Sequence, residues 1–349
     1  METINKLTCP KSESEIQSHW KYTDKVYISC VCITYNHEIY IKDTIDSILA
    51  QKSDYRFELI IHDDKSTDKT RDIILEYKEK FPSIIKLILQ EENQYSKCPR
   101  IIPLTIPYLS GEYVTICEGD DFWIDELKIQ RQVGALNIHK NINICFTPAQ
   151  SLFSNGSTKL VSYHSDQETI FSTDTVIEGG GGFMPTASIM IRNPILNNLP
   201  KWYYTAPVGD YFLQIYASMP SGALYIPNIT CVYRINSIGS WSKQRNSLPL
   251  ADIINEGILY TKSFKQLKHY SIKKEIINSE IAKQYTTLTL LAIKNNYLSS
   301  AKQLIKKSWA YSKKTNKKQI ILFYLKDFMI IFRWVYILKN KLQYNKHTS

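Results

Sequence analysis

The chain has 349 residues, of which 44% are hydrophobic and 12% aromatic, and this composition excludes a globally disordered protein. The formal net charge is +10, but residues 299–349 carry twelve Lys or Arg and one acid, Asp327, so this segment alone has a charge of +11. The other 298 residues therefore sum to −1. A basic C-terminal segment on a nearly neutral body favours a local anionic partner, such as a membrane surface, over general nucleic-acid binding.

The cysteines and the N-terminus indicate a cytoplasmic protein. The seven cysteines form no CxxC pair and do not have the spacing of a zinc site. Their odd number and scattered positions fit a reducing compartment. No apolar segment typical of a secretory signal begins the chain, and residues 1–24 are polar, so we expect a loosely ordered lead-in there.

Strands and helices are expected to alternate over the first part of the chain. Apolar runs predict strands at residues 26–33, 57–61, 84–89 and 113–117. Helical patterns follow at residues 39–50, from Ser66 or Thr67 as N-cap to residue 80, at 99–109 with breaks at two prolines, and at 124–138. This alternation predicts an α/β fold with a mostly parallel sheet flanked by helices.

Three of the predicted strands end in polar clusters. The clusters are residues 34–36, the pair Asp63-Asp64, and residues 118–121, which contain three carboxylates. Parallel strands bring such clusters together at the carboxyl edge of the sheet, where ligands bind in open α/β folds. Crowded carboxylates repel one another, so they indicate a divalent cation such as Mg²⁺ or Mn²⁺, although a solvated acidic turn is the simpler interpretation of an isolated Asp-Asp pair.

Two common nucleotide-binding loops are absent from the sequence. No GxGxxG follows the first strand, which argues against a dinucleotide-binding dehydrogenase, and no GxxxxGK[ST] occurs, which argues against a P-loop ATPase. Side chains and a metal would therefore have to hold a nucleotide here.

The pattern becomes irregular from about residue 142. The glycine run at residues 179–182 is either a flexible loop or a place of close ligand approach. A short strand is expected at 188–192, and a turn entering a helix at 208–216, with Asp210 as either a cap or a catalyst. The remaining segments are a loop at 200–208, a strand at 224–234 and a polar loop at 237–243.

An all-helical region is predicted after residue 249. Residues 272–295 and 300–312 are expected to form a helical hairpin turned at residues 295–296, with Ser300 and Gln303 as a capping box. A basic linker at 313–318 precedes an apolar helix at 320–342. Charged side chains within that helix, among them Lys326, Asp327, Arg333 and Lys339, argue against a membrane span, so it either lies in the bilayer interface or docks on the body.

The ordered motifs resemble family 2 glycosyltransferases. The motifs are residues 31–36, 63–68, Asn93 and 110–113. Further motifs resemble a bacterial branch of this family: residues 118–123, Asp125, 127–128, 130–132, 209–211, 233–234 and 239–242. The match covers about residues 25–243. It implies a GT-A fold, which is Rossmann-like, for a domain at 25–248 followed by a helical region at 249–349.

The resemblance also implies roles for residues of the predicted nucleotide site. Asp63 would read the base, commonly uracil, in a pocket lined by Thr34, Tyr35 and Asn36. Asp120 and Asp121 occupy the position of the DXD-type motif, which holds Mn²⁺ or Mg²⁺ on the donor diphosphate and contacts the ribose.

Two departures from the family pattern leave questions open. Glu118 replaces the usual Asp, so either Glu118 or Asp121 could complete the metal site. Asp210 matches the general base, but the Glu that usually precedes it is Gly209 here. A carboxylate that takes the acceptor proton, together with a metal that neutralises the diphosphate, implies single displacement with inversion.

The function implied is transfer of a sugar, from a donor such as a UDP-sugar, to a glycan or lipid-linked glycan acceptor in bacterial surface polysaccharide synthesis. The enzyme would work in the cytoplasm, with peripheral membrane contact through residues 299–349 and without nucleic acid. One alternative is a catalytically inactive GT-A scaffold anchored by the basic tail. Another is a nucleotidyltransferase, but residues 33–38 lack its Gly- and Arg-rich phosphate loop.

Overall fold

The computed structural model describes residues 4–97, 100–237, 245 and 247–347, and the side chains only up to residue 338. The chain divides into two compact units. The first contains Met1–Pro200 and Val208–Ser240, and the second contains Lys201–Pro207 and Trp241–Ser349. The chain therefore enters the second unit twice, whereas the sequence patterns predict a single boundary at residue 248.

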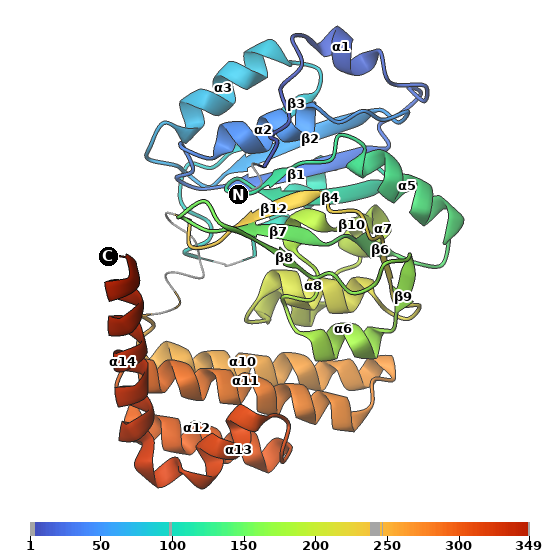
Figure 1. Cartoon of the computed structure of the whole chain (residues 1–349). Coiled ribbons are helices and arrows are strands. Elements are labelled where there is room, and N and C mark those ends of the chain that lie inside the picture. Colours follow the sequence, from blue (N-terminus) through green and yellow to red (C-terminus); the bar gives the residue numbers. More distant parts are fainter. Residues whose placement is uncertain (1–3, 98–99, 238–244, 246, 348–349) are drawn as a thin grey trace. The chain divides into compact units, whose positions relative to one another are not determined.

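The first unit is built on an eight-stranded sheet of order β3-β2-β1-β4-β10-β6-β11-β9 (Figure 1). Its strands are β1 (Ile28–Thr34), β2 (Phe57–Asp63), β3 (Ile85–Leu89), β4 (Tyr113–Glu118), β6 (Ile144–Phe146), β9 (Thr169–Phe171), β10 (Met190–Arg192) and β11 (Ala223–Tyr225). The four predicted strands form the parallel part, β3-β2-β1-β4. β10 is antiparallel to both of its neighbours, so the sheet as a whole is mixed.

Burial explains why the parallel part is regular. All seven residues of β2 are buried, and β1 has one residue that is only partly buried. Strands covered on both faces read as continuous apolar runs, which is the pattern in the sequence. The helices beside them are α2 (Ile41–Leu49), α3 (Thr70–Lys80) and α5 (Lys128–Ile138), and α2 contacts α3 (Figure 1).

A second, four-stranded sheet of order β5-β12-β7-β8 lies in the same unit. Its strands are β5 (Phe122–Trp123), β7 (Ala149–Leu152), β8 (Thr158–Val161) and β12 (Cys231–Arg234). The single strand predicted at 224–234 is therefore wrong, because this stretch forms β11 and β12 in different sheets. Pro227 interrupts it, since proline has no N–H to donate to a strand ladder.

The N-terminal lead-in is more ordered than the sequence predicts. Helix α1 (Glu13–Gln17) is capped by Ser12, and its Ile16 is 1% exposed. The Trp20 ring packs edge-on against Phe57, with 5.7 Å between ring centroids. Two apolar side chains thus attach this polar segment to the first unit.

Several predicted helix ends shift. α3 begins at Thr70 without a side-chain cap, so the predicted caps Ser66 and Thr67 are wrong, and Asp68 accepts a hydrogen bond from the Thr70 N–H instead. α5 begins at Lys128, four residues later than predicted. The predicted helix at 99–109 is reduced to α4 (Ile102–Thr105) and η1 (Ile106–Tyr108). The predicted loop at 200–208 contains a 3-10 helix, η3 (Lys201–Thr205).

The stretch around the glycine run and Asp210 contains short helices. They are α6 (Thr173–Gly179), η2 (Thr186–Ser188), α7 (Asn193–Asn197) and α8 (Gly209–Ala217). The predicted entry into a helix near residue 208 is confirmed by α8. Most of the polar loop predicted at 237–243 lies outside the described residues.

The second unit contains η3 and, from residue 250 onward, a series of helices, as predicted. Its elements are α10 (Leu250–Gln266), η4 (Leu267–Tyr270), α11 (Lys274–Lys294), α12 (Leu298–Tyr311), α13 (Lys317–Tyr324), η5 (Lys326–Phe328) and α14 (Met329–His347). α10 and α11 lie side by side, and α14 runs crosswise to them (Figure 1). None of the described helices combines the length and the apolar character needed to cross a bilayer.

Two details of the helical region differ from the predictions. The hairpin turn at residues 295–296 is confirmed, with Asn296 in the left-handed conformation. α12, however, begins before Ser300, with Tyr297 at its N-cap, so the predicted capping box is wrong. The single helix predicted at 320–342 is interrupted by η5, which separates α13 from α14.

Candidate functional site

The parallel register places the three polar clusters side by side at the carboxyl edge of the sheet. Thr34 pairs with Asp63 across β1 and β2, and Ile33 pairs with Glu118 across β1 and β4. The end of β1 therefore lies between the ends of the two strands that carry acidic residues. The predicted convergence of these clusters is confirmed.

Glu118, Asp120 and Asp121 form an acidic cluster beyond β4. Each offers a carboxylate oxygen, and these oxygens lie within 4.8 Å of one another. Asp120 and Asp121 are buried, at 8% and 1% exposure, whereas Glu118 is accessible to solvent. Three hard oxygen donors this close together fit Mg²⁺ or Mn²⁺, which leave other coordination positions for water or phosphate.

The electrostatics of the cluster show how crowded its negative charges are. Although the Glu118 side chain reaches solvent, the protein atoms packed around its carboxylate and the charges of Asp120 and Asp210 raise its pKa to about 8. Burial, Asp120 and Glu118 raise the pKa of Asp121 well above its ordinary range. Both shifts express the cost of holding several negative charges away from water. A divalent cation would remove that cost.

Gly119 allows the acidic cluster to lie directly against the end of β1. A Cβ atom at this position would be 2.6 Å from Thr34 Oγ1 and 2.8 Å from His37 Nδ1, which is too close for any side chain. Thr44 of α2 also holds this loop, because its hydroxyl donates to the carbonyl of Gly119 at 3.0 Å and to that of Asp121 at 2.6 Å.

Arg234 connects the acidic cluster to the second sheet. Its backbone N–H donates to Asp121 Oδ1 at 2.9 Å, and its guanidinium donates to the backbone carbonyl of Asp120 at 2.5 Å. The same guanidinium pairs with Asp43 and lies over the Phe122 ring, 4.5 Å from its centroid. The sequence motif contains Arg234, but only the structure reveals that it orients the two aspartates.

Asp210 lies near the acidic cluster although it is 90 residues away in the chain. It is the second residue of α8, and Val208 is the N-cap, so Asp210 is not the cap itself. Its Oδ1 accepts a hydrogen bond from the Tyr211 N–H at 2.7 Å. Its charge contributes to the raised pKa of Glu118, and burial raises the pKa of Asp210 too.

Tyr233 lies among these acidic side chains. Burial and then the charges of Asp121, Glu118, Asp120 and Asp210 raise the pKa of its hydroxyl to about 12. β12 therefore supplies both Tyr233 and Arg234 to the site.

Asp63 is already engaged within the protein. It is fully buried, and Nε and Nη2 of Arg71 donate to its Oδ2 at 2.9 and 2.7 Å. The Ser66 N–H lies 3.2 Å from the same oxygen. Arg71 was not predicted as a site residue, and its position in the first turn of α3 is the only sequence signal that could have indicated it.

The other predicted nucleotide-binding residues border the same edge. Tyr35 is 38% exposed, and Asn36 has a left-handed backbone with φ of 54°. Asn36 Oδ1 accepts a hydrogen bond from the Thr67 N–H at 2.7 Å, which joins the loops that follow β1 and β2. Thr34 Oγ1 lies 3.2 Å from His37 Nδ1. Asn36 thus connects loops, whereas the ring of Tyr35 remains accessible.

The glycine run at 179–182 supports the helix that carries Asp210. Gly181 faces Tyr211 of α8, where a Cβ would make an ordinary contact at 3.4 Å, and the Tyr211 hydroxyl donates to the carbonyl of Ile177 at 2.5 Å. Gly180 has a φ of 73°, a conformation that favours glycine. A Cβ at Gly179 would be 2.3 Å from Phe183 Cδ2, so backbone conformation and the packing of Phe183 explain part of this run.

Comparisons with known proteins point to one family. Residues 29–196 match the family model described as glycosyl transferase family 2. A protein of Mycobacterium tuberculosis, described as uncharacterized, is 30% identical over 217 residues, which cover 61% of this chain and 60% of the relative. The putative teichuronic acid biosynthesis glycosyltransferase TuaG of Bacillus subtilis is 31% identical over 152 residues, which cover 44% of this chain and 58% of TuaG. The chain thus spans about 60% of the length of these relatives.

The fold is similar to that of solved structures as well. TarS from S. aureus, in a crystal structure with UDP-GlcNAc, superposes with a TM-score of 0.61 at 14% sequence identity. The superposition covers 88% of this chain and 87% of the TarS chain. At this identity the similarity concerns the fold alone.

Proposed function

Because residues 29–196 belong to glycosyl transferase family 2 and the chain has the GT-A fold, we propose that it transfers a sugar from a nucleotide-diphosphate sugar to an acceptor hydroxyl. The observation that carries this proposal is the acidic cluster of Glu118, Asp120 and Asp121 at the carboxyl edge of the sheet, with Asp210 close by. The family match indicates the reaction class, and the acidic cluster provides the carboxylates that this reaction needs.

Asp120 and Asp121, with Glu118 beside them, would hold Mn²⁺ or Mg²⁺. When bound, the metal would neutralise the charge of the donor diphosphate. Arg234 fixes the orientation of Asp121 through its backbone N–H, and Ser237 donates its hydroxyl to Asp120. These two contacts hold the aspartates in one arrangement whether or not a ligand is bound.

Asp210 would accept the proton of the acceptor hydroxyl as that oxygen attacks the anomeric carbon. A carboxylate is suited to this step, and burial raises the pKa of Asp210, which makes it a stronger base. One carboxylate on the acceptor side implies single displacement with inversion at the anomeric carbon. Tyr233, placed among the four acids, would help to separate the donor side from the acceptor side.

The donor is proposed to be a UDP-sugar, with Thr34, Tyr35, Asn36 and Asp63 on the nucleotide side. The acceptor is proposed to be a glycan or lipid-linked glycan of the bacterial surface. The name of TuaG, which refers to teichuronic acid, and the UDP-GlcNAc in the TarS crystal support these assignments. We place the reaction at the cytoplasmic face of the membrane, with peripheral contact through residues 299–349.

A panel of nucleotide sugars tests the proposal. The protein is mixed with each sugar, with and without Mn²⁺, and its melting temperature is measured. Donor hydrolysis is then assayed for every sugar that raises it. Hydrolysis that requires a divalent ion supports a transferase, whereas metal-independent binding without turnover of any donor would favour the inactive scaffold. Conversion of a nucleotide sugar and added diphosphate into the nucleoside triphosphate and the sugar 1-phosphate would instead indicate a nucleotidyltransferase.

A further inference from the structure

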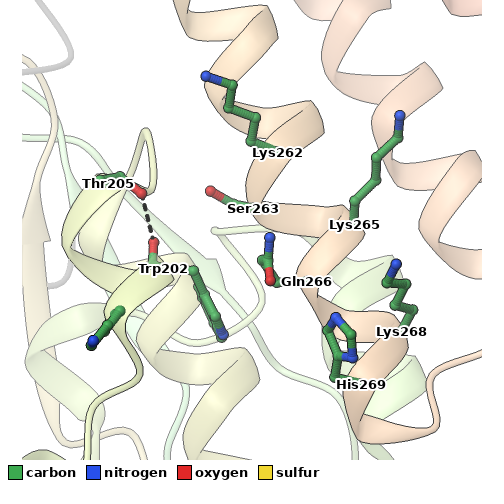
Figure 2. Close-up of a pocket in the computed structure, with 9 residues that line it drawn as sticks. Trp202, Thr205, Lys262, Ser263, Lys265, Gln266, Lys268 and His269 are labelled. Atoms are coloured by element: carbon green, nitrogen blue, oxygen red, sulfur yellow. Dashed lines mark hydrogen bonds between the residues drawn. The ribbon is translucent and has the colours of Figure 1, made fainter.

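A solvent-accessible cavity of about 660 Å³ lies in the second unit (Figure 2). Two short stretches line it: residues 201–205 at η3, and residues 262–269 from the end of α10 into η4. Both belong to the same unit, so the cavity does not depend on how the units are arranged. Its volume is within the range of roughly 300–1,000 Å³ that small-ligand sites occupy.

The walls of the cavity are basic. Four of the nine lining residues are lysines and none is acidic: the lysines are Lys201, Lys262, Lys265 and Lys268. Within the described parts of the chain, Lys201, Lys262 and Lys268 take part in no ion pair. Like charges around one cavity repel each other, and a bound anion would relieve that repulsion.

Ser263 adds a hydroxyl to the wall of the cavity. The residue is only 2% exposed, and its hydroxyl makes no hydrogen bond to any residue that the structure describes. Figure 2 shows the hydroxyl pointing toward Thr205 on the opposite wall. Its oxygen is not among the buried polar atoms that lack a partner, so water in the cavity reaches it and a ligand hydroxyl could replace that water.

The remaining lining side chains suit a sugar ring. The indole of Trp202 forms one wall, and its Nε1 donates to the Tyr270 hydroxyl at 3.4 Å, which limits its rotation. Gln266 and His269 lie across from this ring (Figure 2). An aromatic face packs against the apolar C–H face of a sugar, while amide and imidazole groups bond to its hydroxyls.

We propose that this cavity binds an anionic sugar unit of the acceptor glycan, a sugar that carries a carboxylate or phosphate group. The lysines would contact the anionic group, Trp202 the ring, and Ser263 with Gln266 the hydroxyls. This inference rests on the proposed function, because it identifies the acceptor as an acidic glycan held at a second place on the protein.

Calorimetry with the full chain tests the proposal. A hexamer of α-1,4-galacturonate is titrated into the protein, and maltohexaose serves as the neutral sugar of equal length. We expect the acidic hexamer to bind at least about tenfold more tightly, and its affinity to fall with salt. The double variant Lys262→Gln/Lys268→Gln should weaken this binding about fivefold or more, since two charge contacts are lost.

A matched control is the double variant Lys273→Gln/Lys274→Gln, which removes the same charge from exposed positions outside the cavity. It should change the affinity less than about twofold. Ser263→Ala tests the hydroxyl, and we expect weaker hexamer binding with an unchanged melting temperature, because the hydroxyl has no partner to lose. Equal losses in the cavity variant and the control would overturn the proposal.

Two further titrations distinguish the sources of an anionic group. Inorganic phosphate and phosphatidylglycerol vesicles are each titrated into the wild type and into Lys262→Gln/Lys268→Gln. If either binds the wild type more tightly than the variant while the hexamer does not bind, the cavity serves free phosphate or a lipid headgroup. The proposal is then wrong. Donor hydrolysis by the wild-type protein reports on the proposed function separately. Hydrolysis without hexamer binding therefore rejects only the inference about the cavity.

Discussion

At the end of β4, a single glycine sets how closely the acidic cluster lies to β1. A methyl group at Gly119 would meet both Thr34 and His37 at less than 3 Å, so these side chains would have to move. The same loop is held from other directions by Thr44 and Arg234. These neighbours restrict the backbone of the loop that carries the acidic cluster.

We predict that the activity requires a divalent ion and depends on Asp120. Asp120→Ala should remove activity with little change in melting temperature, because among the described residues the buried Asp120 side chain accepts a hydrogen bond from Ser237 alone. Activity should also be lost in EDTA and return with Mn²⁺ or Mg²⁺. Asp72→Ala, on the exposed side of α3, is the control and should keep full activity. Unchanged turnover in EDTA would contradict this assignment.

Asp210→Asn should lower turnover by about 10²–10⁴-fold, the usual range for loss of a general base. The amide keeps an oxygen that can accept from the Tyr211 N–H, so the start of α8 should be preserved. Turnover, donor affinity and melting temperature are measured together. Nearly wild-type activity, or a lost activity together with a large drop in melting temperature, would make Asp210 a structural residue.

Asp63→Ala should affect stability and nucleotide binding together. Its buried pairing with Arg71 means that removal leaves a guanidinium without its partner, at a cost of about 3–5 kcal/mol in the free energy of unfolding. Nucleotide affinity measured below the melting transition should weaken by ~1–3 kcal/mol. Urea unfolding and titration with UDP separate the two effects. A variant that is destabilised but binds UDP normally would show that Asp63 only orients Arg71.

The candidate site could be predicted as far as its residues follow from strand ends. Asp63, Asp120 and Asp121 each come directly after a buried apolar run, and parallel pairing brings such ends together. Arg71 and Tyr233 could not be predicted as neighbours of these acids from local pattern. Their positions depend on the packing of α3 and on the second sheet, which only tertiary structure determines.

At the scale of elements, α5 shows that a residue of the family motif can stabilise the fold without contacting a ligand. The motif residue Lys128 is completely buried, and its Nζ donates to Thr115 Oγ1 at 3.0 Å and to Gln132 Oε1 at 2.7 Å. Gln132 in turn donates to the carbonyl of Ser188 at 2.7 Å. These contacts attach α5 to β4 beneath the acidic cluster, so this part of the family pattern maintains the sheet.

Lys128→Ala should therefore destabilise the protein without acting on the chemistry directly. It removes a large buried side chain and the two hydrogen bonds that Thr115 Oγ1 and Gln132 Oε1 accept from it, although both residues keep their bonds to the carbonyls of Ile189 and Ser188. We therefore expect a loss of about 2–5 kcal/mol in urea unfolding. Lys128→Met keeps most of the volume over the Trp123 ring and should cost less. Equal stabilities of Lys128→Ala and the wild type would show that the buried network contributes nothing.

The elements that the sequence patterns missed share a physical cause. β6 and β9 have three residues each, too few for a period of two to be recognised, whereas β10 lies within the short strand predicted at 188–192. The helix caps predicted at Ser66 and Ser300 failed because neighbouring contacts determine where those helices begin. Long buried strands and the helical hairpin were predicted correctly, since each repeats its pattern over many residues.

At the scale of the whole molecule, the positive charge lies in the same part of the chain as exposed apolar side chains. Residues 299–349 carry a charge of +11 and the rest −1. α14 contacts α11 and α12, yet Ile331, Trp334 and Leu338 remain 52%, 60% and 57% exposed. The two interpretations left open by the sequence, a docked helix and an interfacial helix, are thus compatible with one helix that uses two faces.

We predict that α14 binds anionic lipid with its exposed face. Ile331 and Trp334 would each bury an apolar side chain in the interface, worth about 1.5–3 kcal/mol, and nearby lysines would add about 1 kcal/mol each near an anionic surface. Ile331→Ser/Trp334→Ser should therefore reduce flotation with phosphatidylglycerol vesicles more than tenfold, on the order expected from that burial. Salt should weaken the binding of the wild type, because part of the attraction is electrostatic.

Ile254→Ser/Ile258→Ser is the matched control, since it removes two exposed apolar side chains from α10 of the same unit. If the two double variants float equally well, or if vesicles of neutral lipid bind as strongly, the exposed face of α14 does not select an anionic membrane.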